Sequence, residues 1–344
     1  MSIEKLDTQR KRRASAVGSR MEDVASLAGV SMITVSRAIN TPDKVSLATR
    51  KRVEAAIRKC GYVPNLTAGS LASNKSRIVA AIVPTIDNSI FAETIRGLSE
   101  TLAAGGYQLL LGQTGYDEHN EEAMVAAFLG RRVDGIVVTG IDHSALTRKR
   151  LRQAGIPVVE TWDLTDRPID MVAGFSNVGA GHAMARYLLA KGHRRLGFAG
   201  GADGRTRARL TGFMAAIHAT RGAHLQQVLL PAGTSFHGGR EALAALLDLD
   251  SSLDAVFLSN DALAVGALME CARRRIRVPQ ELAIAGFADL DIAAEIEPAL
   301  TTVQVGSRKI GEQAGQMLLA RLAGQTVNNP IRDLGFAVVP RASA

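Results

Sequence analysis

The chain has 344 residues, of which 47% are hydrophobic and 22% charged, and its net charge of +8 is modest for its length; this length predicts two or three domains. Its two cysteines, Cys60 and Cys271, lie far apart and outside any metal-binding motif, which fits a reducing compartment. No apolar run approaches the roughly 20 residues of a membrane span and no export signal is evident, so a cytoplasmic protein without membrane contact is expected.

The positive charge is concentrated in the first quarter of the chain. Residues 1–77 contain 15 Lys and Arg against 6 Asp and Glu, a net charge of +9. The remaining residues contain 26 against 27, a net charge of −1. A basic tail without a partner would explain residues 1–18 but not the patterned stretch that follows. The split therefore predicts a small N-terminal module that binds a polyanion.

Three short helices are predicted after the basic tail. Apolar residues at helical spacing predict the first over Met21–Ala28, and Gly29 then supplies a tight turn. Ser31 is placed to cap a second helix over Met32–Asn40. A third helix is predicted over Ser46–Cys60, where it begins at another serine. Two helices joined by a glycine turn are typical of a helix-turn-helix.

The second of these helices has the residues of a DNA reader. Val35 and Ile39 can face inward, which leaves an outward face for the major groove. That face carries Met32, Ile33, Ser36 and Arg37. Arg37 has the reach for two hydrogen bonds to a guanine edge, the commonest specific contact. A small helical domain with merely solvated charges is the alternative.

The whole module matches a known family. The matching stretches are Asp23-Val24-Ala25, Ala28-Gly29-Val30-Ser31, Thr34-Val35-Ser36-Arg37, Asn40, Val45-Ser46, Thr49-Arg50 and Gly61-Tyr62-Val63-Pro64-Asn65. Together they resemble the DNA-binding headpiece of the LacI/GalR repressor family, which implies a headpiece over residues 19–64. The DNA contacts that the resemblance implies are Ser31, Met32, Ile33, Thr34, Ser36, Arg37, Asn40, Ser46 and Thr49. Among them, Met32, Ile33 and Arg37 fall at base-reading positions.

One position before the first helix departs from the family pattern. Arg20 stands where many members have a threonine. Either Ser19 takes over the cap of that helix, or Arg20 contacts a phosphate instead.

A hinge is expected over residues 65–77. Its small residues, including Gly69, give it low helix propensity, so alone in water it should be largely disordered. In the family this segment becomes helical on the operator, and a leucine is wedged into the minor groove. Leu71 matches that leucine, and Asn65 and Ala68 match neighbouring DNA contacts. A plain linker with one buried leucine is the alternative.

From residue 78 onward, apolar strand-like runs alternate with amphipathic helical stretches. The expected strands are 78–84, 107–112, 135–140, 156–161, 196–201, 224–231, 255–260 and 282–287. The expected helices are 91–104, 118–130, 144–154, 181–191, 206–221, 238–248 and 261–274. This rhythm predicts α/β architecture with parallel sheets wrapped by helices. Because it restarts after Gly181, two lobes with a ligand cleft between them are expected.

Signals for catalysis or metal binding in this core are weak. No GxGxxG motif opens the first βα unit, and the glycine cluster at 200–204 has the wrong spacing, so a simple loop is favoured. Asp117, His119, Glu121 and Glu122 could suggest a metal site, but acids at a helix start more readily serve the helix dipole. We therefore expect no enzyme, no cofactor and no metal.

The sequence of the core also matches a domain of a known family. The matching stretches are PTIDNSIFAETIRGL, GYQLLLGQTGYDE, GIPVVETWD, AGFSN, DAVFLSNDALAVGA, VPQELAIAGFADLDIAAEIEPALTTV and RDLGFAVVP. Residues 78–344 resemble the periplasmic sugar-binding-protein-like domain of the LacI/GalR repressors, and most of all those of gluconate utilisation. In the family the chain crosses between the lobes three times. This implies an N-lobe of about 78–175 and 305–326 and a C-lobe of about 176–304 and 327–344.

The resemblance assigns effector contacts to both lobes. Arg209 matches the family's effector clamp, and a guanidinium suits a carboxylate or neighbouring hydroxyls. The implied contacts are Ser89, Phe91, Trp162, Asp163, Arg209, Asn260 and Asp261. Trp162 either covers a polyol face or packs in the N-lobe, and Asp261 matches a structural acid beside the contact Asn260. Ala288 stands where many sugar-binding members have an aspartate, which favours an acid over a neutral sugar.

These observations predict a homodimer that binds double-stranded operator DNA and represses sugar-acid genes. Gluconate or a related sugar acid is the expected effector, and it would release the operator. A corepressor-type regulator that senses another sugar or a purine is one alternative. A solute-binding protein is another, but the basic headpiece argues against it.

Overall fold

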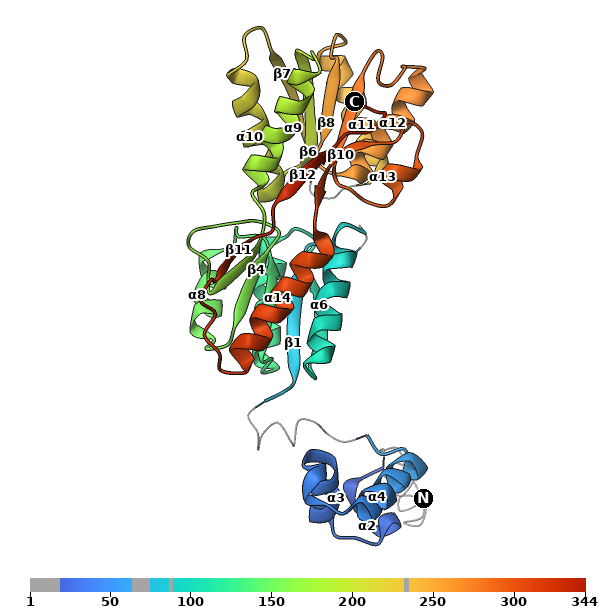
Figure 1. Ribbon diagram of the computed structural model, residues 1–344, viewed down its shortest axis with the longest axis vertical. Helices are drawn as coiled ribbons and strands as arrows, with labels where there is room; N and C mark the ends of the chain where they lie inside the picture. Colours follow the sequence, from blue (N-terminus) through green and yellow to red (C-terminus); the bar gives the residue numbers. More distant parts are fainter. Residues whose placement is uncertain (1–18, 64–74, 87–88, 232–234) are drawn as a thin grey trace, which may run out of the picture. The chain divides into compact units, whose positions relative to one another are not determined.

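The computed structural model describes residues 19–63, 75–86, 89–231 and 235–344 (Figure 1). The chain divides into two compact units, Met1–Ser76 and Arg77–Ala344. The first contains the predicted headpiece and the second contains the α/β core. Among the described residues, no helix is long and apolar enough to cross a membrane.

The headpiece is a three-helix unit with its own small core. Its elements are α2 (Met21–Ala28), α3 (Met32–Asn40), the 3-10 turn η1 (Pro42–Lys44) and α4 (Leu47–Cys60). Val24, Val35 and Val53, one from each long helix, are at most 1% exposed and pack together. Gly29 has a φ of +62°, a left-handed conformation that favours glycine, and it makes the turn between α2 and α3.

Ser19 does not take over the cap of α2, which was one of the two alternatives for the start of this helix. The Ser19 hydroxyl instead donates to the Cys60 carbonyl at the end of α4. Arg20 occupies the cap position, and its backbone N–H donates to the Asp23 carboxylate at 2.6 Å. The Arg20 side chain is exposed, and its contact with phosphate stays a prediction.

The N-lobe is built on a parallel sheet with strand order β11-β5-β4-β3-β1-β2. Its strands are β1 (Ile78–Val83), β2 (Gln108–Gln113), β3 (Gly135–Thr139), β4 (Val158–Thr161), β5 (Met171–Gly174) and β11 (Ile331–Asp333). Its helical elements are η2 (Ser89–Phe91), α6 (Ala92–Ala104), α7 (Glu118–Gly130), α8 (Ala145–Gln153) and α14 (Ser307–Leu322). Helices α6 and α14 lie side by side over one face (Figure 1), and α7 and α8 cover the other.

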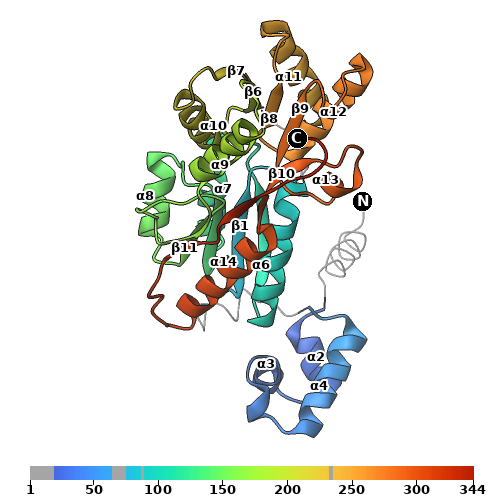
Figure 2. The same cartoon turned by 45° about the horizontal axis from the view of Figure 1, so that its top comes forward.

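The C-lobe repeats this plan. Its sheet has the order β12-β10-β9-β8-β6-β7, and only β12 is antiparallel to its neighbour. Its strands are β6 (Arg195–Gly201), β7 (His224–Leu230), β8 (Ala255–Leu258), β9 (Ala283–Ala288), β10 (Thr301–Val305) and β12 (Phe336–Val339). Its helices are α9 (Asn177–Ala190), α10 (Gly204–His218), α11 (Phe236–Leu249), α12 (Asp261–Arg274) and α13 (Ile292–Glu295). Helices α9 and α10 pack on one face and α11 and α12 on the other (Figure 2).

The last crossing between the lobes lies later in the chain than residue 326. Strand β11 pairs with β5, so residues 331–333 belong to the N-lobe sheet and not to the C-lobe. Backbone bonds from Val172 to the Pro330 carbonyl and from Leu334 to the Gly174 carbonyl hold it there. The chain then passes to β12 in the C-lobe (Figure 1), so the predicted boundary at 326/327 is wrong by several residues.

Glycines let α9 and α10 approach closely. A Cβ on Gly181 would overlap the Arg209 carbonyl, and one on Gly212 would overlap the Val178 carbonyl. Because α10 carries Arg209, this packing places the predicted effector clamp.

We expect Gly181→Ala to destabilise the core by about 3 kcal/mol, because a methyl group there must push two backbones apart. Denaturant unfolding of the full chain would measure this loss. Gly130→Ala in α7 is the matched control, since a Cβ there meets no atom within 4 Å. Equal stability of both variants would contradict the close packing of α9 on α10.

Candidate functional site

The exposed face of α3 joins apolar and basic side chains. Met32 and Ile33 are 49% and 65% exposed, and Arg37 is exposed, whereas Val35 and Ala38 on the opposite face are buried. Ser31 caps the helix by accepting the Thr34 N–H at 3.3 Å. Exposed apolar side chains beside an arginine suit thymine methyl groups and a guanine edge. This face can therefore read DNA bases in a major groove.

The start of α4 offers a second contact for DNA. Ser46 caps it by accepting the Thr49 N–H at 3.3 Å. The N-terminus of this helix presents backbone N–H groups and two hydroxyls to solvent, which suits a phosphate. Such a contact would fix the register of the headpiece on DNA without reading sequence.

Several predicted contacts lie beyond what the structure describes. Asn65, Ala68 and Leu71 lie outside the described residues. Asn40 is the last residue of α3 and Ser89 the first of η2, but their side chains are also outside the description. Their roles stay predictions.

Residues predicted to bind an effector converge between the lobes. Phe91 at the end of η2 and Trp162 after β4 have ring centroids 5.1 Å apart. Trp162 lies 6.0 Å from Phe175, which lies 5.8 Å from Phe287 of β9 in the C-lobe. The Arg209 guanidinium stacks on the Phe287 ring, 4.1 Å from its centroid. The predicted Phe91, Trp162 and Arg209 thus lie along one aromatic column that joins the lobes.

Trp162 occupies the packing role rather than an open wall of the cleft. Trp162 is only 1% exposed, so neither face of its ring is open to a ligand in this structure. The indole N–H donates to Thr94 Oγ1 at 3.1 Å, and the Thr94 hydroxyl donates to the Ser307 carbonyl at 2.8 Å. Trp162 has a φ of +69°, a left-handed conformation that is uncommon for a residue other than glycine.

Arg209 is buried with part of its donor capacity unused. Nη1 donates to Asn177 Oδ1 at 2.7 Å and Nη2 to Thr206 Oγ1 at 3.3 Å. Nε is buried and has no hydrogen-bond partner among the described residues. Burial lowers the pKa of Arg209 to about 10, so the side chain stays charged at neutral pH. A charged, buried group with an unfilled donor suits an anionic or polyhydroxylated ligand.

Asp163 lies close to this arginine. Its carboxylate accepts the Leu164 N–H at 2.9 Å. Burial raises the pKa of Asp163, while a hydrogen bond from Asn177 and the charges of Arg205 and Arg209 act against that rise. The structure thus adds Asn177 and Arg205 to the cluster, and neither was predicted.

Asn260 and Asp261 serve the fold in this structure. The Asn260 side chain caps α12 by accepting the Leu263 N–H at 2.9 Å. Asp261 accepts the Thr302 hydroxyl at 2.6 Å and the Leu290 N–H at 2.7 Å, which ties α12 to β10 and to the segment after β9. Burial raises the pKa of Asp261 to about 6. Asp261 matches the structural acid of the prediction, and its direct contact with an effector stays untested.

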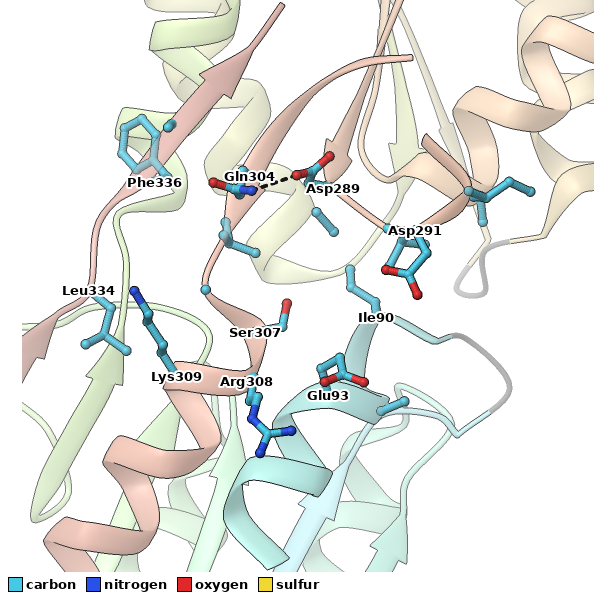
Figure 3. Close-up of a pocket in the computed structure, with 18 of the residues that line it drawn as sticks. Ile90, Glu93, Asp289, Asp291, Gln304, Ser307, Arg308, Lys309, Leu334 and Phe336 are labelled. Carbon is cyan, nitrogen blue, oxygen red and sulfur yellow. Dashed lines mark hydrogen bonds between the residues drawn. The ribbon is translucent and has the colours of Figure 1, made fainter. Parts of the chain in front are cut away.

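A cavity of about 1200 Å³ lies between the two lobes (Figure 3). Both lobes and the crossing segments line it. In the view Asp291 points toward the space, whereas Arg308 points along α6 and donates to Glu312 of α14 at 2.9 Å. The Gln304 amide donates to the Asp289 carboxylate at 2.7 Å in its wall. A cavity of this size accommodates a six-carbon ligand.

The residues that line the cavity differ from those of the arginine cluster. Among the predicted effector contacts whose side chains the structure describes, none lines the cavity, whereas Ile90, Ala262 and Ala288 do. They directly adjoin Phe91, Asp261 and Phe287 in the chain. The cavity and the arginine cluster both lie where the two lobes meet, and they share no lining residue among those that the structure describes. Ala288, where the family often has an acid, forms part of the cavity wall and has a φ of +113°.

The acidic side chains at the start of α7 take part in a helix cap and in contacts with the N-cap of α8 and the residue before it. Asp117 caps α7 by accepting the Asn120 N–H at 2.9 Å. Glu121 pairs with His143 Nδ1 at 2.9 Å, and Glu122 accepts the Ser144 hydroxyl at 2.6 Å. Within the described part of the chain, no group of three or more His, Cys, Asp and Glu side chains is placed to hold a metal.

Known proteins resemble both units of the chain. A family model described as bacterial regulatory proteins, lacI family, matches residues 20–65. A second, described as periplasmic binding protein-like domain, matches residues 185–344. The chain is 35% identical to the HTH-type transcriptional regulator GntR of Escherichia coli K12 over 324 residues, which cover 94% of this chain and 98% of that protein.

Solved structures show the same likeness. A LacI family transcriptional regulator from Silicibacter pomeroyi is 33% identical with a TM-score of 0.89, over 94% of this chain and 99% of that one. The transcription regulator GntR from Chromobacterium violaceum is 38% identical with a TM-score of 0.73, over 77% of this chain and 98% of that one.

Proposed function

The chain belongs to the LacI family and is a DNA-binding transcriptional regulator, and we propose that it represses sugar-acid utilisation genes and leaves its operator when gluconate or a close relative binds. The proposal includes a homodimer on a two-fold operator in the cytoplasm, and it assigns no catalysis to the chain. Buried Arg209, whose Nε is an unfilled donor among the described residues, is the observation that carries the effector half of the proposal.

The proposed operator contacts follow the headpiece geometry. Arg37, Met32 and Ile33 would read bases from α3, and Ser46 and Thr49 would hold a phosphate at the start of α4. We keep the division into headpiece (19–64), hinge (65–77) and core (78–344), with Leu71 as the minor-groove wedge. The described aromatic column supports coupling, since a ligand beside it would touch both lobes at once.

Coupling requires that the effector bind one arrangement of the lobes more tightly than the other. Gluconate would bridge Arg209 on α10 and the N-lobe strand ends, and the relative angle of the lobes would change. The two hinges of the dimer would then separate, and affinity for the operator would fall. A coupling of about 1–3 kcal/mol is typical of such systems, which is roughly a 5- to 150-fold change in operator affinity.

Calorimetry with the full chain tests the effector assignment. We expect saturable micromolar binding of gluconate, with much weaker binding of glucose and gluconolactone, and a loss of operator affinity when gluconate is added. Operator affinity would be measured by fluorescence anisotropy at fixed salt. Tighter operator binding with gluconate would reverse the sign of regulation. Absence of gluconate binding would refute the effector but leave the family assignment intact.

A further inference from the structure

The start of α10 carries three arginines at alternate positions, of which two are buried and one is exposed. Arg205 and Arg209 lie one helical turn apart and are 9% and 5% exposed. Arg207 is exposed and donates from Nε to the Ala202 carbonyl at 3.1 Å. Residues four apart share one face of a helix, so Arg205 and Arg209 both lie on the buried face of α10.

Arg205 is the C-lobe arginine that contacts the strand ends of the N-lobe. Its guanidinium lies 5.4 Å from the centroid of the Phe91 ring. Its Nη1 would be 3.8 Å from a Cβ on Gly140, which follows β3. Its charge also acts on Tyr116, which follows β2, and on Asp163, which follows β4. One side chain of α10 therefore lies near the segments that follow β1, β2, β3 and β4 of the N-lobe.

The donors of both guanidiniums exceed the acceptors around them. Arg205 has five N–H groups, and the acid nearest to it among the described residues is Asp203, with 3.7 Å between Nε and Oδ1. That separation exceeds a hydrogen bond. Asp203 already accepts the Thr206 N–H and hydroxyl as the cap of α10, at 3.2 and 2.7 Å. Among the described atoms of the two guanidiniums, Arg209 Nε is the buried donor without a partner. Arg205 has only a distant acid beside its Nε, so its planar donors suit an additional acceptor-rich group.

We propose that Arg205 binds the carboxylate of the effector and makes the cleft select a sugar acid over the neutral polyol of the same shape. This inference rests on the proposed function and names the residue that sets its ligand class. Arg209 holds the ligand through its free Nε, and Arg205 adds a planar pair of donors that match a carboxylate. A neutral polyol leaves those donors unpaired, so its binding is weaker. Arg205 belongs to the C-lobe and contacts Phe91 of the N-lobe. A carboxylate bound by Arg205 would therefore lie where the two lobes meet.

Arg205→Gln in the full chain tests the inference against Arg207→Gln as a matched control. Calorimetry would compare gluconate with glucitol, its neutral analogue. In the parent chain and in Arg207→Gln, gluconate is expected to bind at least about 10- to 100-fold more tightly than glucitol. In Arg205→Gln, gluconate is expected to fall to the affinity of glucitol, while glucitol binding stays unchanged. Melting temperature and operator binding check that each variant is folded.

The outcomes separate this inference from the function it rests on. If Arg205→Gln keeps the preference for gluconate, Arg205 does not bind the carboxylate, and the proposed effector stands. If the parent chain binds only neutral sugars from a panel with gluconate, galactonate and glucarate, the sugar-acid class and this inference both fall. Should Arg205→Gln not fold, Arg205→Lys replaces it. It keeps the charge but loses the paired donors, and we expect an intermediate preference for the acid.

Discussion

Arg209→Ala is expected to abolish the response to the effector while leaving operator binding intact. The substitution removes the guanidinium that lies 4.1 Å from the Phe287 ring and leaves Asn177 Oδ1 without that donor. Loss of buried, charge-assisted hydrogen bonds to a ligand costs about 3 kcal/mol, or roughly 100-fold in affinity. The headpiece is a separate compact unit, so affinity for the operator should be unchanged. Operator titrations of this variant at increasing gluconate concentrations would all give the same dissociation constant.

The same substitution also separates Arg209 from Arg205. Arg209→Ala should weaken gluconate and glucitol alike, because its unfilled Nε can serve a carboxylate or a hydroxyl. Arg205→Gln should weaken only the acid. Arg209→Lys, which keeps the charge on α10, controls for a general loss of stability. A normal response in Arg209→Ala would mean that the effector binds elsewhere, for instance deeper in the cavity beside Asp289 and Arg308.

Much of the fold could be predicted because local signals agree with the packing. Helices α7 and α12 have the predicted bounds, since each begins at a polar cap, Asp117 or Asn260, and lies between apolar runs. Helix α9 starts at Asn177, before the predicted residue 181, because Ser176 caps it and its early glycines fit against neighbouring elements. Caps and periodicity thus predict where most helices lie, and their first turns are less certain.

Pairing between distant segments could not be predicted in the same way. Strand β11 is three residues long and two of them, Arg332 and Asp333, are polar and exposed, so it has no apolar pattern. Its place in the N-lobe comes from backbone bonds to β5, which lies far away in the sequence. The position of the third crossing follows from that pairing, and no local feature of residues 327–335 signals it.

The predicted site was incomplete for a related reason. The spacing of Arg205 and Arg209 indicates a shared helix face, but a face with two arginines is ordinarily solvated. Its burial depends on Phe91 and Gly140, which the other lobe contributes. The role of Trp162 was left open by the sequence, and only its burial against Phe91 and Phe175 favours packing. The burial of a side chain that lies between two lobes can be predicted only when the arrangement of both lobes is known.

Arg37→Ala is expected to remove most discrimination between the operator and other DNA. Arg37 lies on the exposed face of α3 beside Met32 and Ile33, where a guanidinium can donate two bonds to a guanine edge. Loss of such a bidentate contact costs about 1–3 kcal/mol, roughly 5- to 150-fold in affinity for the operator. Binding to unrelated duplexes depends on phosphate contacts and should change much less. Anisotropy titrations with operator and scrambled duplexes at several salt concentrations would measure both affinities.

Arg58→Ala controls for the lost charge, because Arg58 is exposed near the opposite end of α4 from Ser46. A base-reading role predicts that Arg37→Ala lowers the ratio of operator to scrambled-DNA affinity while Arg58→Ala leaves that ratio unchanged. If both substitutions weaken both duplexes equally and only reduce the salt dependence, Arg37 contacts phosphate rather than bases. The exposed apolar residues Met32 and Ile33 would then recognise the sequence through thymine methyl groups. In that case Met32→Ala and Ile33→Ala would lower the ratio of operator to scrambled-DNA affinity.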